Sequence, residues 1–113
     1  MLSRDPARLM RHFIIATHGH VELRFSRIAY ELAVDLRTLQ RTFRQSFEIS
    51  MRQRQIEVRL SYAKGMLTAV PSVKMSVIAA TLGYRTASDF IRFFQNHVGK
   101  SPAAWGREQR ENG

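Results

Sequence analysis

Apolar residues recur at three- and four-residue spacing along most of the chain, and no stretch of strictly alternating apolar and polar residues competes with this pattern. The first run extends from Pro6 to Ala16. Asp5 precedes it and is suited to N-capping, while Pro6 occupies the first helical position and Gly19 ends the helix. The pattern predicts an all-α protein that begins with this helix.

Further helices are predicted at about 26–33, 36–47, 50–68, 76–82 and 86–97, followed by a short helix that opens at Ser101-Pro102 and contains Trp105. Ser26, Asp35 and Ser50 are the expected N-caps. The long fourth helix must stop before Pro71, because the residue before a proline disfavours helical geometry. The polar end of the chain, from Arg107 on, is predicted to fray.

An internal repeat links the two halves of the chain. Ile28-Ala29 with Leu32 recurs 50 residues later as Ile78-Ala79 with Leu82, and at a spacing of 51 four more positions correspond: Leu39, Arg41, Phe43 and Ser50 with Phe90, Arg92, Phe94 and Ser101. Each half therefore predicts a short helix, a tight turn and a longer helix, which is helix-turn-helix geometry. Gly83 suits the turn of the second copy. Ala33 replaces it in the first copy, so that turn either differs or is mildly strained.

Charge points to a polyanionic partner. The 113 residues carry a formal net charge of +9 with 15 Arg and 3 Lys, and the excess falls in both halves: nine Lys/Arg against four Asp/Glu in residues 24–64, and four against one in residues 74–100. Guanidinium groups grip phosphates and guanine edges bidentately, which favours nucleic acid.

Several other classes of protein are disfavoured. No Cys is present to supply a disulfide or a thiol nucleophile, no triad or phosphate loop exceeds chance, and the four His lack a completing ligand set. We expect no enzyme activity, no cofactor and no metal. No apolar run approaches the roughly 18 residues that span a bilayer, and no hydrophobic leader is evident, so we expect a cytoplasmic protein without membrane contact.

The buried faces of the two longer helices would leave polar faces exposed: Arg37, Gln40, Arg41 and Arg44 in the first copy, and Ala87, Ser88, Ile91, Arg92 and Gln95 in the second. A fourth helix of some 19 residues is about 28 Å long. It could hold the two helices about one DNA turn apart, so that they enter successive major grooves.

Three segments carry a family resemblance: Arg37-Thr38-Leu39-Gln40-Arg41-Thr42-Phe43, then Ile78-Ala79 with Leu82-Gly83-Tyr84, Ser88, Phe90 and Phe94, and finally Gly99-Lys100-Ser101-Pro102. They resemble the two helix-turn-helix motifs of the AraC/XylS family of bacterial transcription regulators, over about residues 6–107. The resemblance implies a seven-helix, bilobed DNA-binding domain. Its expected parts are a first lobe at 6–50, a linker helix at 51–70, a second lobe at 71–109 and a frayed tail at 110–113.

Site residues follow from the same resemblance, position by position. The base-edge candidates are Arg37, Gln40 and Arg41 in the first motif and Ser88, Asp89 and Arg92 in the second, and the phosphate candidates are Arg44, Thr86 and Lys100. Ser88 could instead cap its helix. Asp89 repels phosphates, but it could accept from a cytosine amino group or orient Arg92.

The sequence departs from the family pattern at three positions. Glu48 stands where glycine is usual, and a non-glycine residue in a left-handed cap costs on the order of 1 kcal/mol. Met51 stands after Ser50 where the family has another apolar residue or proline, which is a benign change. Arg54 replaces an aromatic residue, so the first lobe is either less well packed there or the arginine snorkels to solvent.

The leading hypothesis is a sequence-specific regulator of transcription, and the resemblance favours an activator over a repressor. It would bind about 20 base pairs of double-stranded DNA as a monomer, with RNA polymerase as a possible further partner. Two alternatives remain open. One is an architectural DNA- or RNA-binding module without base specificity, and the other is a truncated regulator that lacks a sensor domain. A DNA-repair methyl acceptor of similar fold is nearly excluded, because the chain has no Cys.

Overall fold

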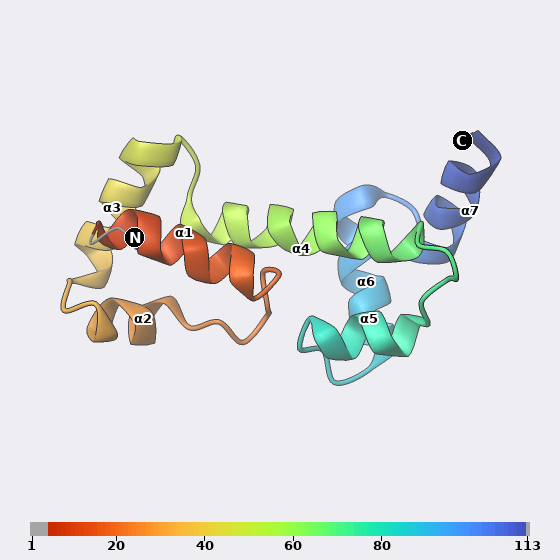
Figure 1. The fold of residues 1–113 in the computed structure, drawn as a ribbon, viewed down its shortest axis with the longest axis horizontal. Coiled ribbons are helices and arrows are strands. Elements are labelled where there is room, and N and C mark those ends of the chain that lie inside the picture. The colour runs from red at the N-terminus through yellow and green to blue at the C-terminus, as the bar shows by residue number, and fades with distance from the viewer. Residues whose placement is uncertain (1–4, 113) are drawn as a thin grey trace. The chain divides into compact units, whose positions relative to one another are not determined.

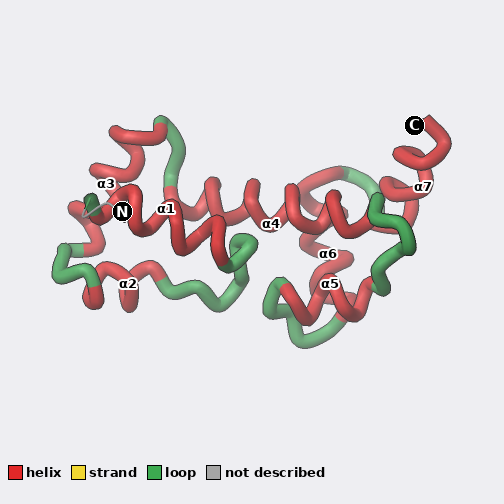
Figure 2. Tube along the Cα trace, in the orientation of Figure 1, coloured by secondary structure: helices red, strands yellow, loops and turns green. Residues whose placement is uncertain are grey.

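The computed structural model describes residues 5–112. Within that range it contains seven helices joined by loops and turns, with no strand (Figures 1 and 2). They are α1 (Pro6–Ala16), α2 (Phe25–Glu31), α3 (Leu36–Phe47), α4 (Met51–Leu67), α5 (Met75–Thr81), α6 (Ala87–Val98) and α7 (Pro102–Asn112). The expectation of an all-α, seven-helix chain is confirmed.

The chain divides into two compact units between Val58 and Arg59. Unit 1 contains α1, α2, α3 and the first part of α4, and unit 2 contains the rest of α4 with α5, α6 and α7. The division falls inside a continuous helix of 17 residues, about 26 Å long. Each unit has its own core, and α4 contributes buried residues to both.

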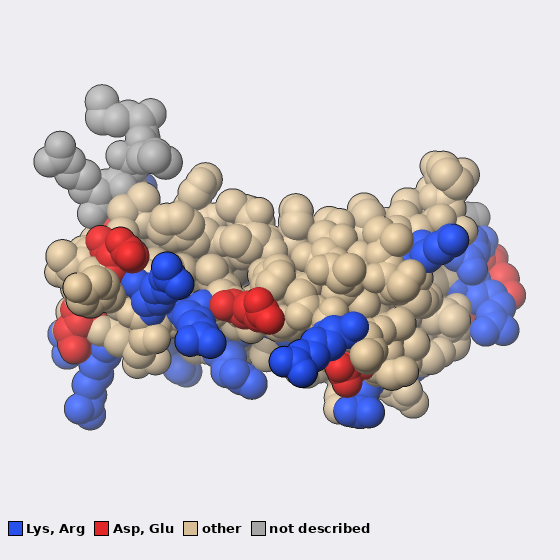
Figure 3. Space-filling model, turned by 90° about the horizontal axis from the view of Figure 1, so that it is seen from below, with Lys and Arg blue, Asp and Glu red and all other residues tan. Residues whose placement is uncertain are grey.

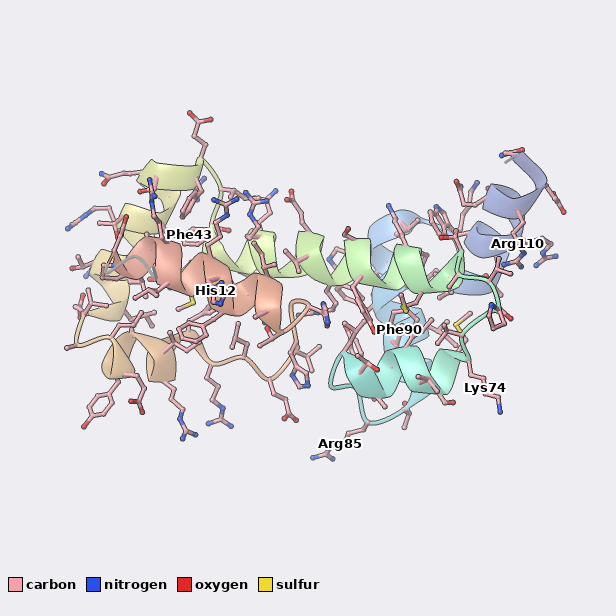
Figure 4. The ribbon with its side chains drawn as sticks, in the orientation of Figure 1. His12, Phe43, Lys74, Arg85, Phe90 and Arg110 are labelled. Carbon is pink, nitrogen blue, oxygen red and sulfur yellow. The ribbon has the colours of Figure 1, made fainter. Side chains whose placement is uncertain are left out.

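In unit 1, α3 packs against α1 and α2. Its Leu39 and Phe43 are fully buried, together with Met10 and Ile14 of α1, and small Ala29 lets α2 approach α3 closely (Phe43 is labelled in Figure 4). Phe43 also meets the edge of Phe47, with 4.8 Å between ring centroids. Burial of these apolar faces fixes which face of α3 points to solvent.

Unit 2 repeats this packing. Phe90 and Phe94 of α6 are fully buried against Ile78 and Ala79 of α5 (Phe90 is labelled in Figure 4), and Trp105 of α7 lies edge-on to Phe94 with 5.9 Å between the ring centroids. The aromatic side chains named in the two units therefore pack in or against their cores.

The internal repeat extends to the backbone of the two turns. The amide of Val34 donates to the carbonyl of Ala29 at 3.0 Å, and the amide of Tyr84 donates to the carbonyl of Ala79 at 2.9 Å, one repeat later. Ala33 has φ 55° where Gly83 has φ 93°. The first turn therefore does not differ from the second, and Ala33 holds a left-handed conformation that disfavours a side chain.

Most expected helix starts are confirmed by capping hydrogen bonds. A backbone amide in the first turn of α3, α4 and α7 donates to the side chain of Asp35, Ser50 or Ser101 respectively, each at 3.1 Å. The expectation for Ser26 is wrong: α2 begins at Phe25, and Arg24 at its N-cap makes no side-chain capping bond. Phe25 packs against the core of unit 1, and this contact sets the start of the helix in place of a cap.

The tail that the sequence predicts to fray is helical as far as Asn112, where α7 ends; Gly113 lies outside the described residues. Two causes extend the helix. Arg, Glu and Gln are good helix formers, and the Arg110 Nη1 atom donates to the carbonyl of Leu67 at 3.3 Å, which ties α7 to the end of α4 (Arg110 is labelled in Figure 4).

Two departures from the family pattern have visible consequences in unit 1. Glu48 caps α3 in the left-handed region, at φ 60° and ψ 20°, just as Gly99 caps α6 at φ 87°. Arg54 snorkels: its Nε atom is buried without a hydrogen-bond partner among the described residues, while its Nη1 atom lies 3.8 Å from a Glu57 carboxylate oxygen.

A buried arginine of α4 packs against two aromatic rings, one in α6 and one in the turn before it. Arg59 of α4 is only 7% exposed, and its guanidinium carbon lies 4.7 Å from the ring centroid of Phe93 and 5.8 Å from that of Tyr84. The Arg59 Nη1 atom also donates to the Tyr84 hydroxyl at 3.2 Å. Burial raises the pKa of Tyr84 above its ordinary value of 10.0, although the Arg59 charge and hydrogen bond act in the opposite direction.

Candidate nucleic-acid interface

The outer face of α3 is cationic and open to solvent. Arg37, Gln40, Arg41 and Arg44 are all exposed, whereas Leu39 and Phe43 on the other side of the helix are fully buried. No acidic residue lies between Leu36 and Phe47. A helix with this division of faces presents guanidinium and amide groups, which are the side chains best suited to bidentate contacts with guanine and adenine.

The outer face of α6 has a different composition. Ser88 and Arg92 are exposed, and Asp89 is partly exposed. An Asp89 carboxylate oxygen lies 3.8 Å from the Arg92 Nη1 atom, so the carboxylate holds the guanidinium on the same side of the helix. The structure thus contains the Asp89–Arg92 contact that an orienting role for Asp89 requires.

Thr86, not Ser88, caps α6. Its hydroxyl oxygen accepts a hydrogen bond from the amide of Asp89 at 3.2 Å. The oxygen is the acceptor in this bond, so the hydroxyl proton remains available to a phosphate oxygen. The cap therefore leaves room for the expected phosphate contact.

Lys100 follows the glycine cap of α6 and is already engaged within unit 2. Its Nζ atom forms an ion pair with a carboxylate oxygen of Glu108 on α7. Both side chains are about half exposed, at 50% and 42%. A phosphate that binds Lys100 must therefore displace this carboxylate or share the ammonium group with it.

A hollow of about 550 Å³ lies beside the outer face of α3 in unit 1. It is lined by residues of α2, α3 and the start of α4, namely Phe25, Gln40, Arg41, Arg44, Ser50, Met51 and Arg52. The fold thus brings Arg52 to the predicted contact residues of α3. Sequence reasoning missed this residue, because its position follows an expected cap and carries no helix-turn-helix signal.

Lysine and arginine side chains also project from parts of the chain other than α3 and α6. In the view of Figure 3, Lys and Arg side chains project separately from the surface, with fewer Asp and Glu among them. In unit 2, Arg85 and Lys74 point away from the helices (Figure 4), and Arg85 immediately precedes the Thr86 cap. A larger hollow in unit 1, about 760 Å³, is lined by residues 21–24, 27 and 28 and mixes Glu22 with Arg24 and Arg27.

These features together are two helix-turn-helix units, with a cationic outer face on α3 and a polar outer face on α6 that carries Arg92 and Asp89. A family model described as a helix-turn-helix domain matches residues 28–108, which is most of the chain. The chain belongs to the AraC-type helix-turn-helix family. The family and the fold are those of DNA-binding transcription regulators rather than of enzymes.

Two individual relatives are also regulatory proteins. The chain is 28% identical over 99 residues to the Msm operon regulatory protein of Streptococcus mutans, and this match covers 88% of the chain but 35% of that protein. The C-terminal domain of AraT, a response regulator from Geobacillus stearothermophilus, is 25% identical with a TM-score of 0.80, over 92% of this chain and 85% of that one. The chain spans about a third of the length of the curated relative.

A third match bears on the fold alone. The DNA-binding domain of AdpA, a global transcriptional factor solved in complex with a target DNA, is 22% identical with a TM-score of 0.78, over 96% of each chain. No helix within residues 5–112 combines the length and the apolar character needed to cross a bilayer.

Proposed function

We propose that this AraC-type domain binds double-stranded DNA sequence-specifically, with α3 and α6 each entering a major groove. One observation carries the proposal: in both units the same turn and the same buried aromatic face leave an Arg-bearing face of the second helix exposed. The AdpA domain, which has the same fold, was solved with a target DNA, and this supports the partner class.

In this proposal the exposed residues have separate roles. Arg37, Gln40 and Arg41 contact base edges from α3, and Ser88 and Arg92 do so from α6, with Asp89 accepting from a base or orienting Arg92. Arg44, Thr86 and Lys100 bind phosphates, which position the protein and make its affinity salt-dependent.

We further propose that one chain suffices for a site of about 20 base pairs, because it holds two helix-turn-helix units where many regulators need a dimer. The role is that of an activator that contacts RNA polymerase, acting on DNA in the bacterial cytoplasm. The resemblance to the AraC/XylS family supports these finer points.

Selection of duplexes from a random DNA pool tests the proposal first. We expect an asymmetric consensus that spans two successive helical turns, with binding that weakens steeply as salt rises in a fluorescence-anisotropy titration. Competition with random DNA and structured RNA separates this function from an architectural or RNA-binding module. Equal binding to all competitors would refute sequence-specific recognition.

Arg41→Ala tests the assignment of a base contact. We expect a loss of about 1 to 3 kcal/mol on the selected duplex and relaxed specificity at one base pair. Arg8→Ala is a matched control, because Arg8 is an exposed arginine of unit 1 on α1, outside the recognition face. Equal weakening of Arg41→Ala on every sequence would reassign Arg41 to phosphate binding.

A further inference from the structure

The strongest unexplained feature is the hollow between α2, α3 and the start of α4. Three arginines line it, Arg41 and Arg44 from α3 and Arg52 from α4, and no lining residue is acidic. Within residues 5–112 none of the three forms an ion pair with a carboxylate. Three like charges around one hollow repel one another, and an anion placed among them relieves that repulsion.

The walls of the hollow fit a phosphodiester. Phe25 and Met51 provide apolar wall, while Ser50 and Arg52 belong to the N-terminal end of α4, where the helix dipole favours negative charge. The Ser50 hydroxyl oxygen accepts a hydrogen bond from the amide of Gln53 at 3.1 Å, so its hydroxyl proton remains available to an anion. The three guanidinium groups supply the larger number of donors, and their planar forks match a phosphate bidentately.

We propose that Arg52 and Arg44 form a clamp for one phosphate of the DNA backbone, next to the base-reading residues Gln40 and Arg41. The inference rests on the proposed function, since it needs α3 to lie in a major groove. Arg52 then acts as a positioning residue: it fixes the depth and register of α3 on the duplex and does not read a base itself.

The second unit lacks this clamp. At the repeat spacing of 51, Gln95 corresponds to Arg44 and Ala103 corresponds to Arg52, so both guanidinium groups are absent. Of the three arginines that line the hollow, only Arg41 has an arginine at the corresponding position of the second unit, namely Arg92. The clamp is therefore a property of the first helix-turn-helix unit, and it makes that unit the stronger binder of the DNA backbone.

Arg52→Ala tests the clamp on the selected duplex and on a random duplex. We expect both affinities to fall by the same factor, on the order of tenfold, and the slope of log affinity against log salt to become less steep by about 1. Arg52→Lys should recover part of the loss, because it keeps the charge but not the fork. Arg52 is exposed and makes no described ion pair, so the variant should fold, which circular dichroism checks.

A chemical control identifies the phosphate. Methylphosphonate groups, which carry no charge, replace the phosphates of the selected duplex one at a time. At one position the Arg52→Ala effect should disappear, because the contact is already lost. A loss that persists on every modified duplex would overturn the clamp, since the arginine would then act only through its long-range field.

The remaining outcomes separate the clamp from the function. If Arg52→Ala matches the Arg8→Ala control while the wild type still selects its sequence, the clamp is wrong and the proposed function stands. If Arg52→Ala weakens only the selected duplex, Arg52 reads a base and the clamp is wrong. If the wild type prefers no sequence, the proposed function itself fails.

Discussion

Glu48→Gly should stabilise unit 1 by removing backbone strain at the end of α3. Glu48 holds φ 60° and ψ 20°, a left-handed conformation that costs an L-residue roughly 1–2 kcal/mol. Its carboxylate also lies at the negative end of the α3 dipole, worth about 0.3–1 kcal/mol. Glycine loses more conformational entropy on folding, about 0.5–1 kcal/mol. The net expectation is a gain of about 1 kcal/mol in the free energy of unfolding.

Urea denaturation followed by circular dichroism measures this gain, and two variants separate its causes. Glu48→Gln removes the charge but keeps the side chain, so it should recover only the part due to the helix dipole. Gly99→Ala is the reverse substitution in unit 2, because it places a side chain at the left-handed C-cap of α6. Its φ is 87°, and an added Cβ would meet no atom within 4 Å, so its expected loss of about 1 kcal/mol arises from the backbone alone.

The comparison of these variants can refute the reasoning. If Glu48→Gly is no more stable than Glu48→Gln, the left-handed conformation carries no strain worth relieving. If Gly99→Ala is as stable as the wild type, the same conclusion extends to the second unit, and the argument from φ fails for both caps.

Three further predictions concern the second unit. Asp89→Asn should free Arg92 from its 3.8 Å ion pair and remove a charge that repels phosphates. In anisotropy assays, affinity for all duplexes should then rise a few-fold, while discrimination between duplexes should fall. Unchanged discrimination would contradict an orienting role for Asp89. Glu108→Gln should release Lys100 and steepen the salt dependence of DNA binding, and an unchanged slope would show that the ion pair does not compete with phosphate. Burial favours the neutral phenol of Tyr84 and raises its pKa in the folded protein, so the stability that Tyr84 contributes is complete below pH 10.0. Above pH 10.0 that stability falls, because Tyr84 ionises first in the unfolded chain. Tyr84→Phe should reduce this fall in urea unfolding midpoints, and an equal fall in the variant would reject the assignment to Tyr84.

The sequence predicts local features well where each one depends on a few neighbouring residues. Asp35 and Ser50 cap their helices because a short side-chain oxygen can reach an unpaired amide two or three residues on. The buried faces of α3 and α6 follow from the spacing of Leu39, Phe43 and their counterparts in the repeat. These features need no knowledge of tertiary structure.

Features that depend on contacts between distant residues could not be predicted in this way. Ser26 looks like a cap, but the packing of Phe25 against the core decides where α2 begins. The sequence of the tail is polar, and only the fold shows that Arg110 at the end of α7 bonds to the end of α4. Arg52 joins α3 at a common hollow only because α4 starts beside it. In each case a tertiary contact overrides or adds to the local pattern.

The predicted cationic contacts of the two units differ in whether a carboxylate already holds them. In unit 2, Arg92 pairs with Asp89 and Lys100 pairs with Glu108, so DNA must exchange or share each pair and gains less from every contact. In unit 1, Arg44 and Arg52 have no such pair among the described residues, and they gain the full phosphate interaction. Phosphate affinity should therefore come mainly from unit 1, and base discrimination should depend more evenly on both. A duplex that keeps only the half-site of α3 would then retain most of the salt dependence, whereas the half-site of α6 alone would retain little of it.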